Sequence, residues 1–79
     1  MARFYFHMRT GDHVEIDTDG TELPGLTAAK DEALQSAREI LADAIRASRH
    51  PIDAFVIADD SGRELETVSL KDVLPKGLG

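Results

Sequence analysis

Three histidines are the residues with the clearest capacity for chemistry in this chain: His7, His13 and His50. Imidazole is a frequent zinc ligand, so a metal site is the first chemistry to consider. His7 and His13 could be near one another across a hairpin, on the outer face of a small sheet, and a metal site there would need a third ligand such as Glu15. The alternative is a solvated or interface face. We adopt that alternative, and we predict no metal and no cofactor.

Two aspartate-rich segments, 17–20 and 59–62, have the composition of tight turns. The first is similar to the start of a calcium loop, but the twelfth position of an EF-hand loop must be acidic and is Ala28 here. Ser61 as a nucleophile would need a neighbouring base, and none can be identified. One helix on four strands also offers little concavity for a catalytic pocket. We therefore predict no catalytic residue and no enzyme.

Residues 3–9 alternate in polarity, which is typical of a half-buried strand. A basic, partly aromatic strand face is used by some RNA-binding sheets for stacking. Only one aromatic residue lies on this face, and the net charge of −6 repels phosphate backbones. We therefore expect no nucleic-acid partner. The apolar face carries Phe4, Phe6 and Met8, and the opposite face carries Arg3, Tyr5, His7 and Arg9.

The elements that position these residues follow from the pattern along the chain. Val14 and Ile16 indicate the second strand of a hairpin, and residues 21–26 form a connector because Pro24 and Gly25 interrupt it. An amphipathic helix is predicted from about Thr27, as the N-cap, to Arg49. We expect one apolar stripe on this helix, formed by Ala33, Leu34, Ala37, Ile40, Leu41, Ala44 and Ile45.

A second hairpin follows the helix. Residues 54–58 are apolar without alternation, which favours a central strand covered on both faces. In the last strand, residues 65–70, Leu65 is out of phase with the apolar residues after it. Either a bulge or an apolar patch on the outer face explains this. Residues 69–74 suit a short helical turn, and residues 75–79 suit a frayed tail.

These elements make a single α+β domain over residues 1–79: a ββαββ chain with a four-stranded antiparallel sheet in the order 2-1-3-4 and one helix on one face. We expect no element of the chain to cover the other face. A domain of 79 residues without cysteine has few ways to gain stability besides oligomerisation. The prediction is a non-catalytic protein-interaction module that forms a homodimer, with another protein as a further possible partner. The predicted interaction face contains Tyr5, His7, Arg9, Val56 and Leu65.

Cellular location can also be addressed from composition. No apolar run approaches the roughly 20 residues that span a bilayer. The first residues enter a strand pattern at once and contain no apolar region typical of a signal peptide. We expect a cytoplasmic protein that does not enter a membrane.

The sequence resembles a bacterial family of short proteins catalogued as domain of unknown function number six-eight-nine-four. The resemblance implies a small α+β fold and attaches no activity, cofactor or catalytic residue. It is carried by Arg3-Phe4-Tyr5-Phe6-His7, Gly11-Asp12, Asp19-Gly20-Thr21-Glu22-Leu23-Pro24, Ala28-Ala29, Glu32-Ala33-Leu34, Asp59-Asp60-Ser61-Gly62-Arg63 and Thr67-Val68.

A second, local resemblance concerns the segment that leads into the helix. Leu23-Pro24-Gly25-Leu26-Thr27-Ala28-Ala29, with Glu32-Ala33-Leu34 and Ala37-Arg38-Glu39, is similar to HicB-type antitoxins. That resemblance implies neutralisation of a small RNase toxin as an alternative function. The Gly-Asp-Thr insertion and the DNA-binding segment of those antitoxins have no counterpart here, so control of an operon is not implied.

Overall fold

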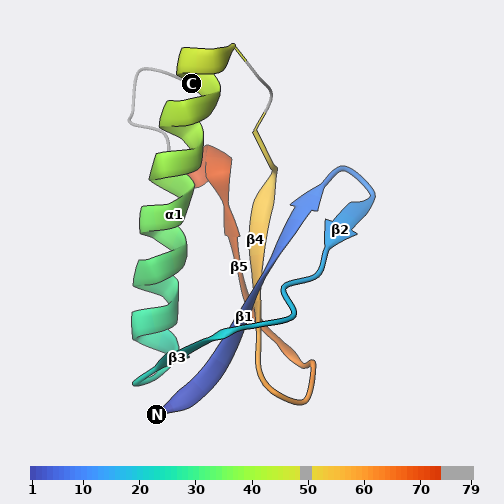
Figure 1. The fold of residues 1–79 in the computed structure, drawn as a ribbon, viewed down its shortest axis with the longest axis vertical. Helices are drawn as coiled ribbons and strands as arrows, with labels where there is room; N and C mark the ends of the chain where they lie inside the picture. The colour runs from blue at the N-terminus through green and yellow to red at the C-terminus, as the bar shows by residue number, and fades with distance from the viewer. Residues whose placement is uncertain (49–50, 74–79) are drawn as a thin grey trace.

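A computed structural model describes residues 1–48 and 51–73. One helix lies along one face of an antiparallel sheet, so the predicted α+β class is confirmed (Figure 1). The short 3-10 helix η1 follows the last strand. The elements are β1 (Ala2–Thr10), β2 (His13–Glu15), β3 (Thr21–Leu23), α1 (Leu26–Ala47), β4 (Ala54–Ala58), β5 (Glu64–Ser69) and η1 (Leu70–Asp72).

The sheet has the order β2-β1-β4-β5, which is the predicted order of the four predicted strands. The structure adds β3, which pairs with Ala2–Phe4 of β1, whereas β2 pairs with Met8–Thr10. Residues 21–23 lack an alternating pattern and precede Pro24, so the sequence indicated only a connector there. Both short strands run antiparallel to β1, and residues 16–20 between them leave the ladder.

The hydrophobic core lies between α1 and the sheet. Alanines form the centre of the helix face, and Ala29, Ala33 and Ala37 have no exposed surface. Their small side chains let the helix approach the sheet closely, so that Phe4 and Ile57 are also buried. The predicted stripe is confirmed for Ala33, Leu34, Ala37, Ile40, Leu41 and Ala44, and it is wrong for Ile45, which is 72% exposed.

Both predicted ends of the helix need correction. The helix begins at Leu26 with Gly25 as N-cap, because Ala29 N–H already donates to the Gly25 carbonyl. Thr27 is therefore inside the first turn and is not the cap. At the other end Ser48 takes a left-handed conformation (φ 54°) and its N–H donates to the Ile45 carbonyl. The helix thus ends at Ala47, while Arg49, His50 and residues 74–79 lie outside the described residues.

The second hairpin confirms two predictions. All five residues of β4 are buried between β1 and β5, as expected for a central strand. The register of β5 shifts by one residue between Ile57 and Ala58, which makes Leu65 the extra residue of a bulge. The bulge alternative is therefore the right one. Leu65 packs against the core, and η1 supplies the predicted short helical turn.

Candidate interaction surface

The sheet face opposite α1, called the outer face below, is built from three rows of side chains that cross β1, β4 and β5. Each row has a large residue on β1, a small or β-branched residue on β4 and a polar residue on β5. Such rows form because alternate residues of paired strands share one face. The rows are Tyr5–Ala58–Glu64, His7–Val56–Thr67 and Arg9–Ala54–Ser69.

The β4 residues at the centre of the outer face are buried, although no described helix or strand lies on this face. Val56 is only 5% exposed, and Ala54 and Ala58 have no exposed surface. Each of the three lies between a side chain of β1 and a side chain of β5 in its own row. A partner that docks here therefore meets the β1 and β5 side chains, and the predicted contact residue Val56 supports the surface from beneath.

Part of the outer face is covered by the loop of residues 17–20. The N–H of Asp17 donates to Nδ1 of His7 at 3.1 Å, and the guanidinium of Arg3 donates to the Asp19 carbonyl at 2.8 Å. A Cβ atom on Gly20 would lie 2.9 Å from Cε2 of Tyr5. The expectation that nothing in the chain covers this face is therefore wrong for its β1 side.

The carboxylate of Asp17 holds this loop against β1. It accepts the N–H groups of Phe6 at 3.1 Å, Asp19 at 3.1 Å and Gly20 at 3.2 Å. Partial burial would raise the pKa of Asp17, but these three donors and the nearby charge of His7 outweigh it and lower the pKa below its ordinary value of 3.8. Asp17 is thus a charged structural acceptor. The predicted turn is confirmed, with a long-range contact added.

The turn of residues 59–62 has the same composition and stays local. Asp59 accepts the Ser61 hydroxyl at 2.6 Å and the N–H groups of Ser61 and Arg63. The Ser61 hydroxyl bond is the main reason that the pKa of Asp59 is lowered. Gly62 has a positive φ of 85°. The hydroxyl of Ser61 is therefore a turn donor, as the turn prediction implies.

The structure brings together four of the five residues predicted for the interaction face. Tyr5, His7 and Arg9 lie half-buried on the outer face beside Val56. Leu65 does not join them, because the bulge turns it toward the helix side.

His7 and His13, the two histidines considered for a metal site, do not share a face. His13 pairs with Thr10, which alternates with Arg9 and therefore points to the face that carries α1. Within residues 1–48 and 51–73, no group of three or more His, Asp or Glu side chains is placed to hold a metal ion.

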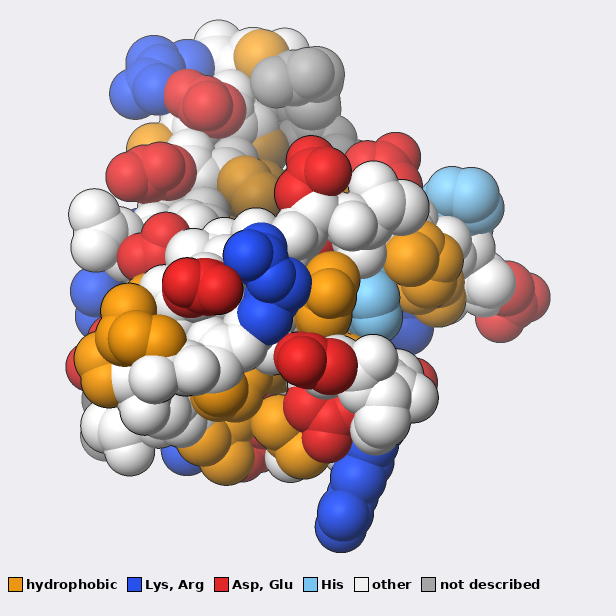
Figure 2. Space-filling model, turned by 60° about the horizontal axis from the view of Figure 1, so that its bottom comes forward, with side chains coloured by type: hydrophobic (Ala, Val, Ile, Leu, Met, Phe, Trp, Pro, Cys, Tyr) orange, Lys and Arg blue, Asp and Glu red, His pale blue; other side chains and the backbone are white. Residues whose placement is uncertain are grey.

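The sequence indicated a strand at Val14 and Ile16 but did not predict how exposed these two apolar residues are. Val14 pairs with Arg9 at the margin of the outer face and is 42% exposed, and Ile16 is 60% exposed. Their alternation predicted partial burial, but β2 has only three residues and all of them are exposed. The sequence feature that could have indicated their exposure is that the hairpin around them is short and polar. In the view of Figure 2, hydrophobic side chains likewise reach the surface between acidic ones.

Comparison with known proteins identifies a family model. The model described as domain of unknown function (DUF6894) matches residues 3–71. Neither the curated proteins nor the solved structures include a match to the chain. The resemblance to HicB-type antitoxins is not among these findings and stays a prediction. In the described part of the chain, no helix has the length and apolar character needed to cross a membrane.

Proposed function

Since the chain belongs to the DUF6894 family, whose description names no activity, we propose from its surfaces that it is a small cytoplasmic, non-catalytic interaction module that forms a homodimer. The observation that carries the proposal is the margin of the outer face, where Val14 leaves 42% of its surface exposed beside Arg9. No described helix or strand packs on this face.

The composition and rigidity of the outer face support a protein partner. Tyr and Arg are enriched at protein interfaces. Tyr5 is held against Gly20, and His7 accepts the Asp17 N–H, so neither must be ordered on binding. A standard interface buries about 800 Å² per partner. That is roughly a seventh of the 5434 Å² that the chain exposes.

The titratable groups support a non-catalytic role. A carboxyl group that acts as a general acid needs its pKa raised toward the working pH. The two carboxyl groups with a clear shift, Asp17 and Asp59, both have a lowered pKa, and turn hydrogen bonds explain both shifts. The absence of cysteine is compatible with the reducing cytoplasm.

Sedimentation equilibrium at micromolar concentration tests the proposal. We expect a dimer for the unmodified chain. Val14→Ser should raise the dissociation constant of the dimer about thirtyfold, because burying the exposed part of a valine is worth about 1 kcal/mol and a symmetric interface contains the residue twice. Arg9→Glu should weaken the dimer further, because it replaces a cation with an anion beside a partner whose net charge is −6.

Ile45→Ser is the matched control, because Ile45 is an exposed apolar residue on α1. It should leave the dissociation constant unchanged. A monomer for the unmodified chain would overturn the dimer. An effect of Ile45→Ser without an effect of Val14→Ser would move the interface to the helix.

A further inference from the structure

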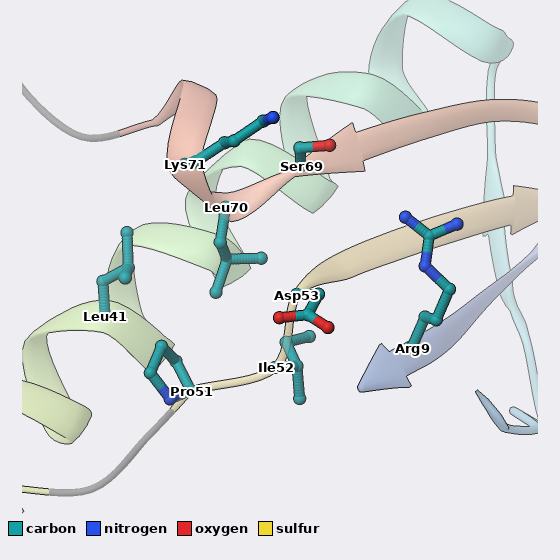
Figure 3. A pocket seen from close by; sticks show the side chains of 8 residues that line it. All are labelled: Arg9, Leu41, Pro51, Ile52, Asp53, Ser69, Leu70 and Lys71. Atoms are coloured by element: carbon teal, nitrogen blue, oxygen red, sulfur yellow. The ribbon is translucent and has the colours of Figure 1, made fainter. Parts of the chain in front are cut away.

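An open groove of about 480 Å³ lies at the end of the sheet where β1 ends, β4 begins and η1 follows β5 (Figure 3). Its apolar lining comes from three parts of the fold: Leu41 from α1, Ile52 from the segment before β4, and Leu70 from η1. The remaining lining residues are Arg9, Pro51, Asp53, Ser69 and Lys71.

The backbone of Asp53 ties these segments together. Its N–H donates to the Arg9 carbonyl at 2.8 Å, and its carbonyl accepts the Leu70 N–H at 2.9 Å. Its carboxylate accepts the N–H of Gly11 at 2.7 Å. The strand end, the segment before β4 and η1 are thus fixed relative to one another, and Leu70 is only 3% exposed. The groove is a built feature of the fold.

Two cations line the groove. Figure 3 shows the guanidinium of Arg9 and the amine of Lys71 both extending toward the Ser69 end. Neither side chain has a hydrogen bond or an ion pair with any residue in the described ranges, whereas Arg3 pairs with Glu22 and Lys30 with Glu66. With Asp53 as the single acidic group, the lining is positive on balance, in a chain of net charge −6.

We propose that this groove binds an extended peptide segment of a partner protein in which an acidic side chain follows an apolar one. The apolar side chain would lie over Leu41 and Ile52, which are partly exposed, and Arg9 and Lys71 would receive the carboxylate. The groove is open, whereas small-molecule sites enclose most of their ligand, so a peptide fits it better.

The carboxylate belongs to a side chain of that segment. Sites for a terminal carboxylate use free backbone N–H groups. In this groove the N–H groups of Asp53 and Leu70 already donate to backbone carbonyls. This site goes beyond the proposed homodimer and does not depend on it, since only Arg9 and Ser69 among its lining residues lie on the outer face.

Amide chemical shifts of the ¹⁵N-labelled full chain provide the test. The probe is a Gly/Ser peptide with a central Leu-Glu pair, acetylated and amidated at its ends. We expect saturable shifts at the amides of Ser69, Leu70 and Lys71. A Leu-Gln probe and a Ser-Glu probe should each bind about fivefold or more weakly, in line with the loss of one charge-assisted contact or one buried side chain.

Arg9→Gln and Lys71→Gln should each weaken binding of the Leu-Glu probe about fivefold. The matched control is Arg38→Gln, because Arg38 is an exposed cation on α1, and it should change nothing. Equal binding of Leu-Glu and Leu-Gln, shifts away from the groove, or an equal effect of Arg38→Gln would overturn the proposal. A probe that binds only with a free C-terminus would overturn the side-chain assignment.

Failure of the peptide proposal can be distinguished from failure of the dimer proposal. The oligomeric state can be measured in the same samples by light scattering. Loss of the dimer by Val14→Ser should leave the groove shifts intact, because Val14 does not line the groove. Loss of the groove shifts by Lys71→Gln should leave the dimer intact.

Discussion

The two turns that begin with aspartate and end with glycine, residues 17–20 and 59–62, share a pattern and differ in reach. Among the residues that the structure describes, those that donate to the Asp59 carboxylate lie within four positions of it. Asp17 also accepts the N–H of Phe6, eleven residues away in β1. One turn closes a hairpin, whereas the other fastens a loop over the outer face. The same local chemistry therefore shapes one loop and, elsewhere, part of a surface.

We expect the two turns to differ most in the free energy of unfolding that is lost when the Asp17 or the Asp59 carboxylate is removed. Asp17→Ala leaves three backbone N–H groups without their acceptor, one of them in the partly buried middle of β1. We expect a loss of about 2–3 kcal/mol in the free energy of unfolding, measured by urea denaturation at a fixed protein concentration.

Asp59→Ala serves as the matched variant and should cost clearly less, because all the groups that it frees are exposed to water. Equal losses for the two variants would show that the contact of Asp17 with β1 adds nothing.

The glycines that end the two turns give the next difference. Both have a positive φ, so alanine at either position should cost about 1 kcal/mol for its backbone conformation. At Gly20 a Cβ would also lie 2.8 Å from Cγ of Arg3 and 2.9 Å from the Tyr5 ring, while at Gly62 nothing lies within 4 Å. We therefore expect Gly20→Ala to cost about 2 kcal/mol and Gly62→Ala about 1 kcal/mol, as measured by urea denaturation. The comparison would be broken if the two losses were the same.

Acid should weaken the fold through the same two carboxyl groups. Each has a pKa lowered below its ordinary value of 3.8 in the folded chain, so each binds a proton more readily when the chain is unfolded. The stability that they contribute is therefore present above 3.8 and is lost as the pH falls through the lowered folded pKa. The urea concentration at the midpoint of unfolding, measured at a series of pH values from neutral downward, should decrease once the pH is below 3.8.

The acid-dependent fall should be smaller in Asp17→Ala and in Asp59→Ala than in the unmodified chain, since each variant lacks one of the two groups. If both variants lose as much stability in acid as the unmodified chain does, other carboxyl groups cause the acid sensitivity.

The sequence predicted the features of the fold that have a local cause. The alternation of residues 3–9 identified β1, and the apolar run at 54–58 identified a buried central strand. The short strand β3 was missed, because its pairing with β1 depends on a loop whose path Asp17 determines. Composition showed that residues 17–20 turn. It did not show where their hydrogen bonds go, since a long-range partner leaves no periodic signal in the chain.

The candidate surfaces show the same limit. Tyr5, His7 and Arg9 share a face because alternation places them there, and the sequence predicted that. The bulge at Leu65 turned the fifth predicted residue away, and the groove around Asp53 joins residues far apart in the chain. Its two cations, Arg9 and Lys71, are 62 positions apart. Spacing along the chain contains no information about such a pair.

The smallest predicted effect concerns the imidazole that faces the fastened loop. Nδ1 of His7 accepts the Asp17 N–H, so the ring proton lies on Nε2 in the neutral side chain. His7→Phe keeps a ring on the outer face and removes this acceptor. We expect a loss of about 1 kcal/mol, because one hydrogen bond to an edge loop is removed while most of the packing stays. Ring ¹⁵N shifts of His7 in the unmodified chain should report the Nε2–H form, and they should change in Asp17→Ala, which releases the loop. An Nδ1–H form would mean that His7 does not hold the loop, and the difference between the two turns would then depend on the Asp17 carboxylate alone.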